Sequence, residues 1–266
     1  MTYLDELENK TIYIIREAYA RFKNIGLLWS IGKDSTSLLW IIRKAFFGKI
    51  PFPVIHIDTG FKFKEIYEFR DRYSEQWGLD LIISRNEKAF KKEMSPEKGR
   101  FECCNALKTE ALKITLKERN LKALLLAIRR DEHGIRAKER YFSPRAIDFK
   151  WNYQDQPPEL WDLYKSKIDA EQHFRVHPML HWTELDIWRY IQRERMPIVG
   201  LYFAKKGKRY RSIGCERCCA SVKSNAGSIK KIVGELEVTK IAERSGRSQD
   251  KENSYTMQKL RSLGYM

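Results

Sequence analysis

The chain has 266 residues, which is enough for one large α/β domain or for one domain with a C-terminal extension. Its hydrophobic content of 42% supports a sizeable core, and no apolar run approaches membrane-spanning length. The net charge of +16 attracts polyanions, and so large a surplus favours nucleic acid over a small anion. The N-terminal stretch predicts an amphipathic helix without the features of a signal peptide, so we expect a cytoplasmic protein.

Short apolar runs alternate with segments of helical periodicity along the first half of the chain. This alternation predicts an α/β fold with a doubly wound, mostly parallel sheet that carries helices on both faces. Ligands of such sheets bind beyond the carboxyl ends of the strands, so the polar residues after each strand are site candidates. The predicted strands are Gly26–Trp29, Pro53–Asp58, Leu79–Ser84 and Ala123–Ile128, and the predicted helices are Ser35–Phe47, Lys64–Gly78 and Asn105–Arg119.

The stretch from Leu27 to Ser37 predicts a strand, a sharp polar turn and the start of a helix. Free backbone N–H groups and the positive helix end would converge at this turn, and Lys33 adds a compact cation. The arrangement suits a phosphate chain better than a carboxylate, and a solvated turn is the simpler alternative. The residues that would form the site are Ser30, Gly32, Lys33, Asp34, Ser35 and Thr36.

Ile31 stands inside this turn, at a position where a β-branched residue resists a positive φ angle. Either Ile31 keeps ordinary backbone angles, or the turn binds pyrophosphate more weakly than a glycine would allow. The Walker pattern is absent, so the turn is not the usual P-loop.

Two further polar groups follow predicted strands. Asp58 ends the second strand and could accept from a ribose hydroxyl or an adenine amino group. His56 on the same strand is equally compatible with a place in the core. Arg129, Arg130 and Arg136 follow the fourth strand, where they would bind phosphate oxygens and offset charge developing on the α-phosphoryl group. A solvated basic loop is the alternative.

The second half of the chain is less regular. Asp131 to Pro158 is polar and long for a loop, which indicates a functional segment. A helix is predicted within Pro178–Arg195, with Thr183 as its N-cap and Asp186 three residues later. A basic run interleaved with aromatic residues then predicts either a nucleic-acid patch or a mobile surface loop, and consists of Tyr202, Phe203, Lys205, Lys206, Lys208, Arg209, Tyr210 and Arg211.

The five cysteines occur in only two places, and their clustering indicates a metal. An odd number in a cytoplasmic chain argues against a disulfide framework. Cys103, Cys104, Cys215 and Cys218 could together hold a [4Fe–4S] cluster, with zinc as the chemical rival and buried free thiols as the third possibility. Cys219 would be a spare.

The turn after the first strand resembles the SGGKDS loop of the ATP pyrophosphatases, which cleave ATP between the α- and β-phosphates. Ile31 stands where that loop usually has glycine. Motifs along nearly the whole chain resemble the family of sulfate adenylyltransferase small subunits and sulfonucleotide (PAPS) reductases. These motifs are Phe52–Tyr73, Cys103–Leu112, Arg129–Arg140, Pro157–Trp161, Trp182–Ile191, Ser224–Ala226 and Glu243–Arg247.

The resemblance implies a fold like that of the adenine nucleotide alpha hydrolases and a substrate ATP that carries Mg²⁺. It implies that the turn binds pyrophosphate, that Asp58 and Arg136 lie at the nucleotide, and that five residues take part in catalysis. Those five are Lys33, Asp34, Ser35, Arg129 and Arg130.

The cysteines set the chain apart from the sulfate-activating members of that family. By resemblance to the reductases, the quartet implies a [4Fe–4S] cluster, with zinc less favoured. Those reductases also need a reactive cysteine near the C-terminus, and no cysteine follows Cys219. Reductase chemistry is therefore disfavoured.

Together these features are similar to the ATP-pyrophosphatase components of DNA phosphorothioate modification systems. The similarity implies that ATP adenylates a backbone phosphate of DNA (or RNA), and that a cysteine desulfurase partner supplies the incoming sulfur. The alternative is a sulfate adenylyltransferase small subunit that makes adenosine 5′-phosphosulfate with a GTPase subunit. Two further alternatives are tRNA thiolation and a non-catalytic module that binds nucleotide or nucleic acid.

The expected domains are an ATP pyrophosphatase domain over residues 1–200 and a basic, mainly helical C-terminal extension over residues 201–266. The extension would carry the second cysteine group. No membrane contact is expected, and a homodimer is left open.

Overall fold

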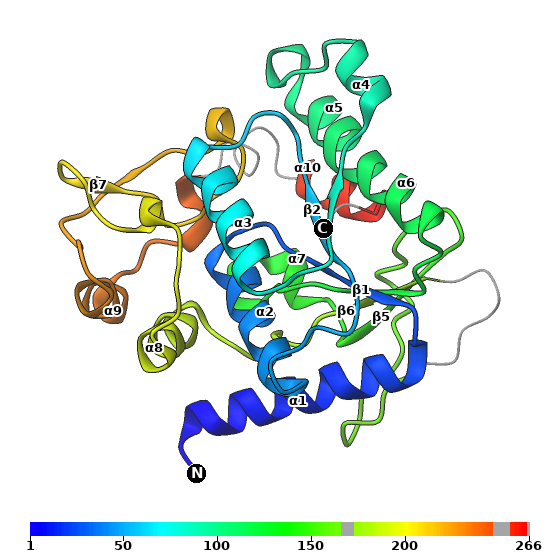
Figure 1. Ribbon diagram of the computed structural model, residues 1–266, viewed down its shortest axis with the longest axis horizontal. Coiled ribbons are helices and arrows are strands. Elements are labelled where there is room, and N and C mark those ends of the chain that lie inside the picture. The colour runs from blue at the N-terminus through cyan, green and yellow to red at the C-terminus, as the bar shows by residue number, and fades with distance from the viewer. Residues whose placement is uncertain (166–172, 247–255, 265–266) are drawn as a thin grey trace.

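The computed structural model describes residues 1–165, 173–246 and 256–264, and its centre is a six-stranded sheet (Figure 1). The strand order is β3-β2-β1-β4-β6-β5, and every neighbouring pair is parallel except β5 with β6. The predicted doubly wound, mostly parallel sheet is confirmed. The strands are β1 Ile25–Leu28, β2 Val54–Ile57, β3 Leu81–Ser84, β4 Ala123–Leu125, β5 Phe142–Arg145 and β6 His173–Val176.

Helices cover both faces of the sheet. The longer ones are α1 Tyr3–Phe22, α2 Lys33–Ala45, α3 Lys64–Gln76, α6 Ala111–Glu118 and α8 Glu184–Glu194. Successive residues of a strand point to opposite faces, so Leu27 packs into the core with α1, α2, α3 and α8. Its neighbour Leu28 packs on the other face with α6. This alternation divides the apolar interior into two layers.

The smaller elements refine the predicted boundaries. They are α4 Glu87–Lys91, α5 Arg100–Cys104, a π-helical turn Asn105–Glu110, α7 Gly134–Ala137, β7 Lys208–Arg209, β8 Val222–Lys223, α9 Ile229–Val238 and α10 Thr256–Ser262. The predicted fourth strand extended to Ile128, whereas β4 ends at Leu125, and the N–H of Leu126 makes a last hydrogen bond to the carbonyl of Val176 on β6. The predicted helix from Asn105 begins as the π-helical turn rather than as α-helix.

The segment Asp131–Pro158 contains a strand that the sequence did not predict. Strand β5 pairs antiparallel with β6, and Pro144 in its middle breaks the usual strand pattern. Because β5 lies at the edge of the sheet, the missing N–H of proline is tolerated there. The predicted helix start at Thr183 is confirmed: its side chain accepts from Asp186 N, and the Asp186 carboxylate accepts from Thr183 N.

The sheet topology fixes where a ligand can bind. From β1 the chain continues through β2 and β3 on one side, while β4 lies on the other side of β1. A crevice forms at the carboxyl ends of strands at such a point. Ser30 follows β1 and Arg129 follows β4, so the topology brings the polar turn and the arginines together.

The chain after residue 200 packs against the rest of the molecule. Tyr202 reaches the first turn of α2, Lys62 and Cys215 form an isolated β-bridge, and α9 packs on α8. Two domains divided at residue 200 therefore stay a prediction. Within the described ranges, no helix has the length and apolar character that a membrane span needs.

Candidate nucleotide site and cysteine cluster

The polar turn joins β1 to α2 with Gly32 as the N-cap in an extended conformation. Ile31 has a φ of +64°, so the expectation that it could keep ordinary backbone angles is wrong. A β-branched residue in this region costs about 1–3 kcal/mol. Its side chain is 1% exposed and packs in the main core, and that burial offsets the strain. The turn thus adopts a conformation suited to glycine while anchoring an apolar side chain.

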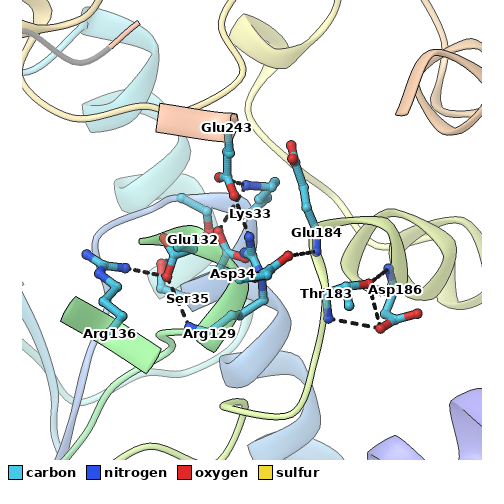
Figure 2. A network of polar contacts seen from close by, with 12 residues as sticks. Lys33, Asp34, Ser35, Arg129, Glu132, Arg136, Thr183, Glu184, Asp186 and Glu243 are labelled. Carbon is cyan, nitrogen blue, oxygen red and sulfur yellow. Dashed lines mark hydrogen bonds and ion pairs between the residues drawn. The ribbon is translucent and has the colours of Figure 1, made fainter. Parts of the chain in front are cut away.

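Lys33 and Arg129 are fully buried cations at the carboxyl end of the sheet, and they share a carboxylate, Glu243. Figure 2 shows Glu243 reaching from the C-terminal segment toward Lys33, with Asp34 beside both. Arg129 also pairs with Asp34 and Asp131. Burial disfavours charge on Glu243, but Arg129 and Lys33 outweigh it and hold the pKa of Glu243 well below its usual range.

A second ion pair, Glu132 with Arg136, borders the first (Figure 2). Burial opposes ionisation of Glu132, yet Arg136 and Arg129 lower its pKa to about 2. Carboxylate oxygens of Asp34, Glu132 and Glu243 lie within 4.8 Å of one another. Magnesium prefers one or two carboxylates together with phosphate oxygens, so this donor set fits a Mg²⁺ that arrives with ATP.

These groups surround a cavity of about 130 Å³. Pockets that hold molecules the size of ATP are larger, on the order of 300 Å³ or more. Glu243 and Arg244 line the cavity from the C-terminal segment and take up part of the space beside Lys33. We infer that this segment must shift before a nucleotide can enter.

Six of the predicted site residues line this cavity, and others do not. Thr36 is buried and accepts from Trp29 Nε1 at 3.1 Å. Asp58 accepts from Gly60 N and Tyr67 Oη, both at 2.8 Å, and Arg130 lies over the ring of Tyr141. Arg129 stands behind the lining and contacts it through Asp34 and Glu243. The lining residues that the sequence predicted are Ser30, Gly32, Lys33, Asp34, Ser35 and Arg136.

His56 belongs to the core rather than to the cavity. Its Nδ1 lies 3.0 Å from the carbonyl oxygen of Trp29, and burial lowers its pKa to about 3. The imidazole is therefore neutral at physiological pH.

Sequence reasoning missed several residues of the site. The prediction of free amides is wrong at Lys33, whose N–H donates to Tyr202 Oη at 2.8 Å. In the sequence, Glu243 stood out only as part of a family motif. No local sequence pattern indicated that its carboxylate pairs with Lys33. The missed lining residues are Leu28, Lys62, Lys108, Leu126, Ala127, Ile128, Glu132, Tyr202, Ser212, Ile213, Gly214, Glu243 and Arg244.

The cysteine quartet comes together from α5 and from the loop around residue 215. All four thiols are buried, and the other three of them contribute, after burial itself, to raising the pKa of Cys103 to about 12. Lys108 lines the nucleotide cavity and acts in the opposite direction on Cys103 and Cys218. Lys108 therefore connects the thiols electrostatically to the cavity, and Gly214, the residue before Cys215, is part of its lining.

The arrangement of the thiols bears on the metal they would suit. A tetrahedral zinc site brings its thiolates within about 4 Å of one another. Of the described residues, the group of three or more metal-ligating side chains within 4.8 Å consists of carboxylates and includes no thiol. The identity of a metal at the cysteine quartet therefore stays a prediction.

Part of the basic run is structural, which narrows the predicted nucleic-acid patch to its exposed lysines. Arg209 is buried against Glu235, and Arg211 pairs with Glu184. Tyr202 is buried, and Tyr210 packs edge-on against Phe63. Four exposed lysines are left on the β7–β8 hairpin and its flank: Lys205, Lys206, Lys208 and Lys223.

Comparison with known proteins shows which family the chain resembles. Residues 24–221 match the phosphoadenosine phosphosulfate reductase domain. A relative from Geotalea uraniireducens, named sulfate adenylyltransferase subunit 2, is 39% identical over 296 residues, which covers 100% of this chain and 98% of the relative. A relative of the same name from Allorhizobium ampelinum is 38% identical, and the match covers 99% of this chain and 93% of the relative.

Solved structures share the fold at lower identity. Candida glabrata FMN adenylyltransferase in complex with ATP superposes with a TM-score of 0.57 at 20% identity, over 81% of this chain and 62% of that protein. Candida auris phosphoadenylyl-sulfate reductase superposes with a TM-score of 0.56 at 16% identity, over 84% of this chain and 98% of that protein. With this fold and a family match through residues 24–221, the chain belongs to the phosphoadenosine phosphosulfate reductase family.

Proposed function

We propose that the protein transfers the adenylyl group of ATP to an oxygen acceptor and releases pyrophosphate. The observation that carries this proposal is the pair of buried cations, Lys33 and Arg129, which share the carboxylates of Glu243 and Asp34 beside the turn after β1. A buried cation pair of this kind is an anion site that the protein fills with its own side chain. Phosphate oxygens are better matched to it, because they offer more charge and more acceptors.

The proposed roles follow from position. Lys33 and Arg129 exchange Glu243 for oxygens of the outer phosphates, and Ser30 and Ser35 donate hydroxyl groups beside them. Arg136 lines the same cavity and offsets charge at the α-phosphoryl group. Asp34 would hold Mg²⁺, which neutralises phosphate charge when bound. The protein orients ATP and acceptor in line rather than forming a covalent intermediate.

Sulfate is the first acceptor to consider, because full-length relatives at 38–39% identity are named sulfate adenylyltransferase subunit 2. In that case the product is adenosine 5′-phosphosulfate. The name also implies a second subunit, and a GTPase is the partner we expect.

A nucleic-acid phosphate is the second candidate, and two features of this chain favour it. Four exposed lysines crowd one hairpin, and the buried thiols interact electrostatically with Lys108, which lines the proposed nucleotide cavity. Activation of a backbone phosphate followed by sulfur from a cysteine desulfurase would use both. The quartet Cys103, Cys104, Cys215 and Cys218 would then hold the [4Fe–4S] cluster. A tRNA base as acceptor would need the same features.

Lys33→Ala should lower acceptor-dependent pyrophosphate release by about a hundredfold or more, because the variant lacks the buried cation at the phosphates. Release is measured with ATP plus sulfate, DNA or tRNA, and the acceptor that stimulates it identifies the reaction. Lys230→Ala, at an exposed position on α9, is the matched control and should retain full activity. Turnover of Lys33→Ala within twofold of the parent would contradict the proposed site. If the parent protein released no pyrophosphate with any acceptor, the remaining interpretation would be a non-catalytic binding module.

Glu243→Gln should bind ATP about tenfold more tightly in the presence of EDTA, because the carboxylate no longer competes for Lys33 and Arg129. Titration calorimetry measures the change. Glu237→Gln removes an exposed carboxylate of α9 and should leave the affinity unchanged. Weaker ATP binding by Glu243→Gln without metal would mean that Glu243 supports the nucleotide instead of competing with it.

Replacing Lys206 and Lys208 together by alanine should weaken DNA binding, because fewer backbone phosphates are neutralised. A plot of log affinity against log salt concentration should become less steep, by about one for each phosphate contact that the variant loses. Fluorescence anisotropy across a salt series reports both quantities. The control replaces Lys88 and Lys91, two exposed lysines of α4. DNA binding that is absent, or insensitive to salt, would leave sulfate as the sole candidate of the two.

Cys218→Ser should bleach the broad absorbance near ~400 nm that an iron–sulfur cluster confers. Cys219→Ser is a closely matched control, because Cys219 is the next residue and only half-buried. Its spectrum should match the parent. A colourless parent protein with stoichiometric zinc, or equal spectra for the two variants, would reject this ligand set.

A further inference from the structure

A surface groove lined by tryptophans lies outside the nucleotide cavity, and the proposed adenylyl transfer gives it no role. It runs between the second half of α2, the end of α3 and the end of α8 (Figure 1). Its volume is about 460 Å³, and its lining shares no residue with that of the nucleotide cavity among the residues that the structure describes. Trp40, Tyr73, Trp77 and Pro197 form the walls of this tryptophan groove.

The walls offer aromatic surface to a ligand. The ring centres of Trp40 and Trp77 lie 6.0 Å apart with the rings edge-on at 71°, and Tyr73 lies 4.9 Å from Trp77. All three side chains are half-buried: each packs against the main core and leaves part of its ring open. Open aromatic surface of this kind suits a planar ligand such as a nucleobase.

The charged residues of the groove are two arginines, Arg43 and Arg195. The guanidinium carbon of Arg43 lies 5.4 Å and 5.1 Å from the ring centres of Trp40 and Trp77, and Arg195 is exposed at the C-cap of α8. Within the described ranges, neither side chain forms an ion pair or a hydrogen bond. The Nε of Arg43 is closed off from solvent, so its terminal N–H groups are the ones that reach the groove.

The groove lacks counter-charge for these arginines. Of the residues that the structure describes, no carboxylate belongs to its lining. Glu194 accepts from Trp40 Nε1 at 3.3 Å, but Lys44 and Arg193 already pair with this carboxylate. Burial lowers the pKa of Arg43 from its usual value, because no acid offsets the loss of solvent. A phosphate group in the groove would supply the missing negative charge.

We propose that the tryptophan groove binds single-stranded nucleic acid, with a base against Trp40 and Trp77 and backbone phosphates on Arg43 and Arg195. Aromatic surface combined with unpaired cations is what binding of a single strand without sequence preference requires. A guanidinium that stacks on an indole keeps its outer face and its terminal N–H groups for the ligand. The net charge of +16 draws such a polyanion to the protein surface.

Helix α2 connects the groove to the nucleotide cavity. Lys33 begins this helix, and Trp40 and Arg43 follow seven and ten residues later, which places them about 10–15 Å along its axis. A strand held in the groove would therefore lie within reach of the cavity. Binding in the groove requires no catalysis, so it stands independently of adenylyl transfer.

The test compares two labelled strands by fluorescence anisotropy with the full-length chain. One is oligo(dT) of about ten nucleotides, and the other is an abasic strand of the same length, which keeps the phosphates and lacks the bases. The parent protein should bind oligo(dT) more tightly by about fivefold or more, because stacking adds to charge. Trp40→Leu keeps an apolar side chain and removes the ring, so it should reduce that preference to about twofold or less. Thermal melts confirm that the variants are folded.

A matched pair of charge reversals locates the binding surface. Arg195→Glu should weaken binding of both strands by about tenfold, because a cation at the phosphates becomes an acid. Arg119→Glu is the control, since Arg119 is likewise an exposed arginine at a helix C-cap, on α6 at the other face of the sheet. It should change affinity by less than about twofold.

Two results would overturn the proposal outright: equal affinity of the parent protein for the two strands, or equal effects of Arg195→Glu and Arg119→Glu. A glutamate peptide of matched charge serves as a further probe. If it binds more tightly than oligo(dT) and loses affinity in Arg195→Glu, the occupant is an acidic protein segment and the nucleic-acid assignment is wrong.

Discussion

The ion pairs of Glu243 with Lys33 and Arg129 are the constraint on which the candidate site depends. Lys33 begins α2, Arg129 follows β4, and Glu243 lies more than a hundred residues further along the chain. Two buried cations at the end of a sheet need counter-charge, and the protein supplies it from Asp34 and Asp131 together with Glu243 of its C-terminal segment. That segment therefore closes the cavity and also competes with any phosphate that enters it. Under the proposed function, binding of nucleotide and movement of this segment would be linked by charge.

The turn that presents Lys33 is held by apolar packing rather than by glycine. Ile31 adopts a left-handed conformation that is unfavourable for its branched side chain, and its burial in the main core offsets this cost. A glycine there would be relaxed but free to move. The isoleucine fixes the loop more firmly, and the same packing positions Gly32 as the N-cap of α2.

The cysteine quartet and the lysines of the β7–β8 hairpin distinguish this chain from a protein that has a nucleotide site and nothing else. Cys103 and Cys215 come from segments far apart in the sequence, yet both are buried and close enough to affect each other's charge, and Lys108 of the cavity lining acts on Cys103 as well. A sulfate adenylyltransferase needs neither thiols nor a lysine-covered hairpin for its chemistry. Sulfur insertion into a nucleic acid would use both, so the two acceptor classes separate on features outside the shared nucleotide site.

The sequence by itself determined the parallel sheet, the polar turn after β1 and the N-cap at Thr183, because each follows from local periodicity or a short motif. It also identified the cysteine quartet, since clustered thiols stand out in composition. Only the tertiary structure decided which charges meet: Arg209 and Arg211 looked like surface cations but are neutralised by Glu235 and Glu184. It likewise decided that Glu243 and Tyr202 contact Lys33 at the turn after β1. Pairings across so many residues depend on chain topology, which no local pattern encodes.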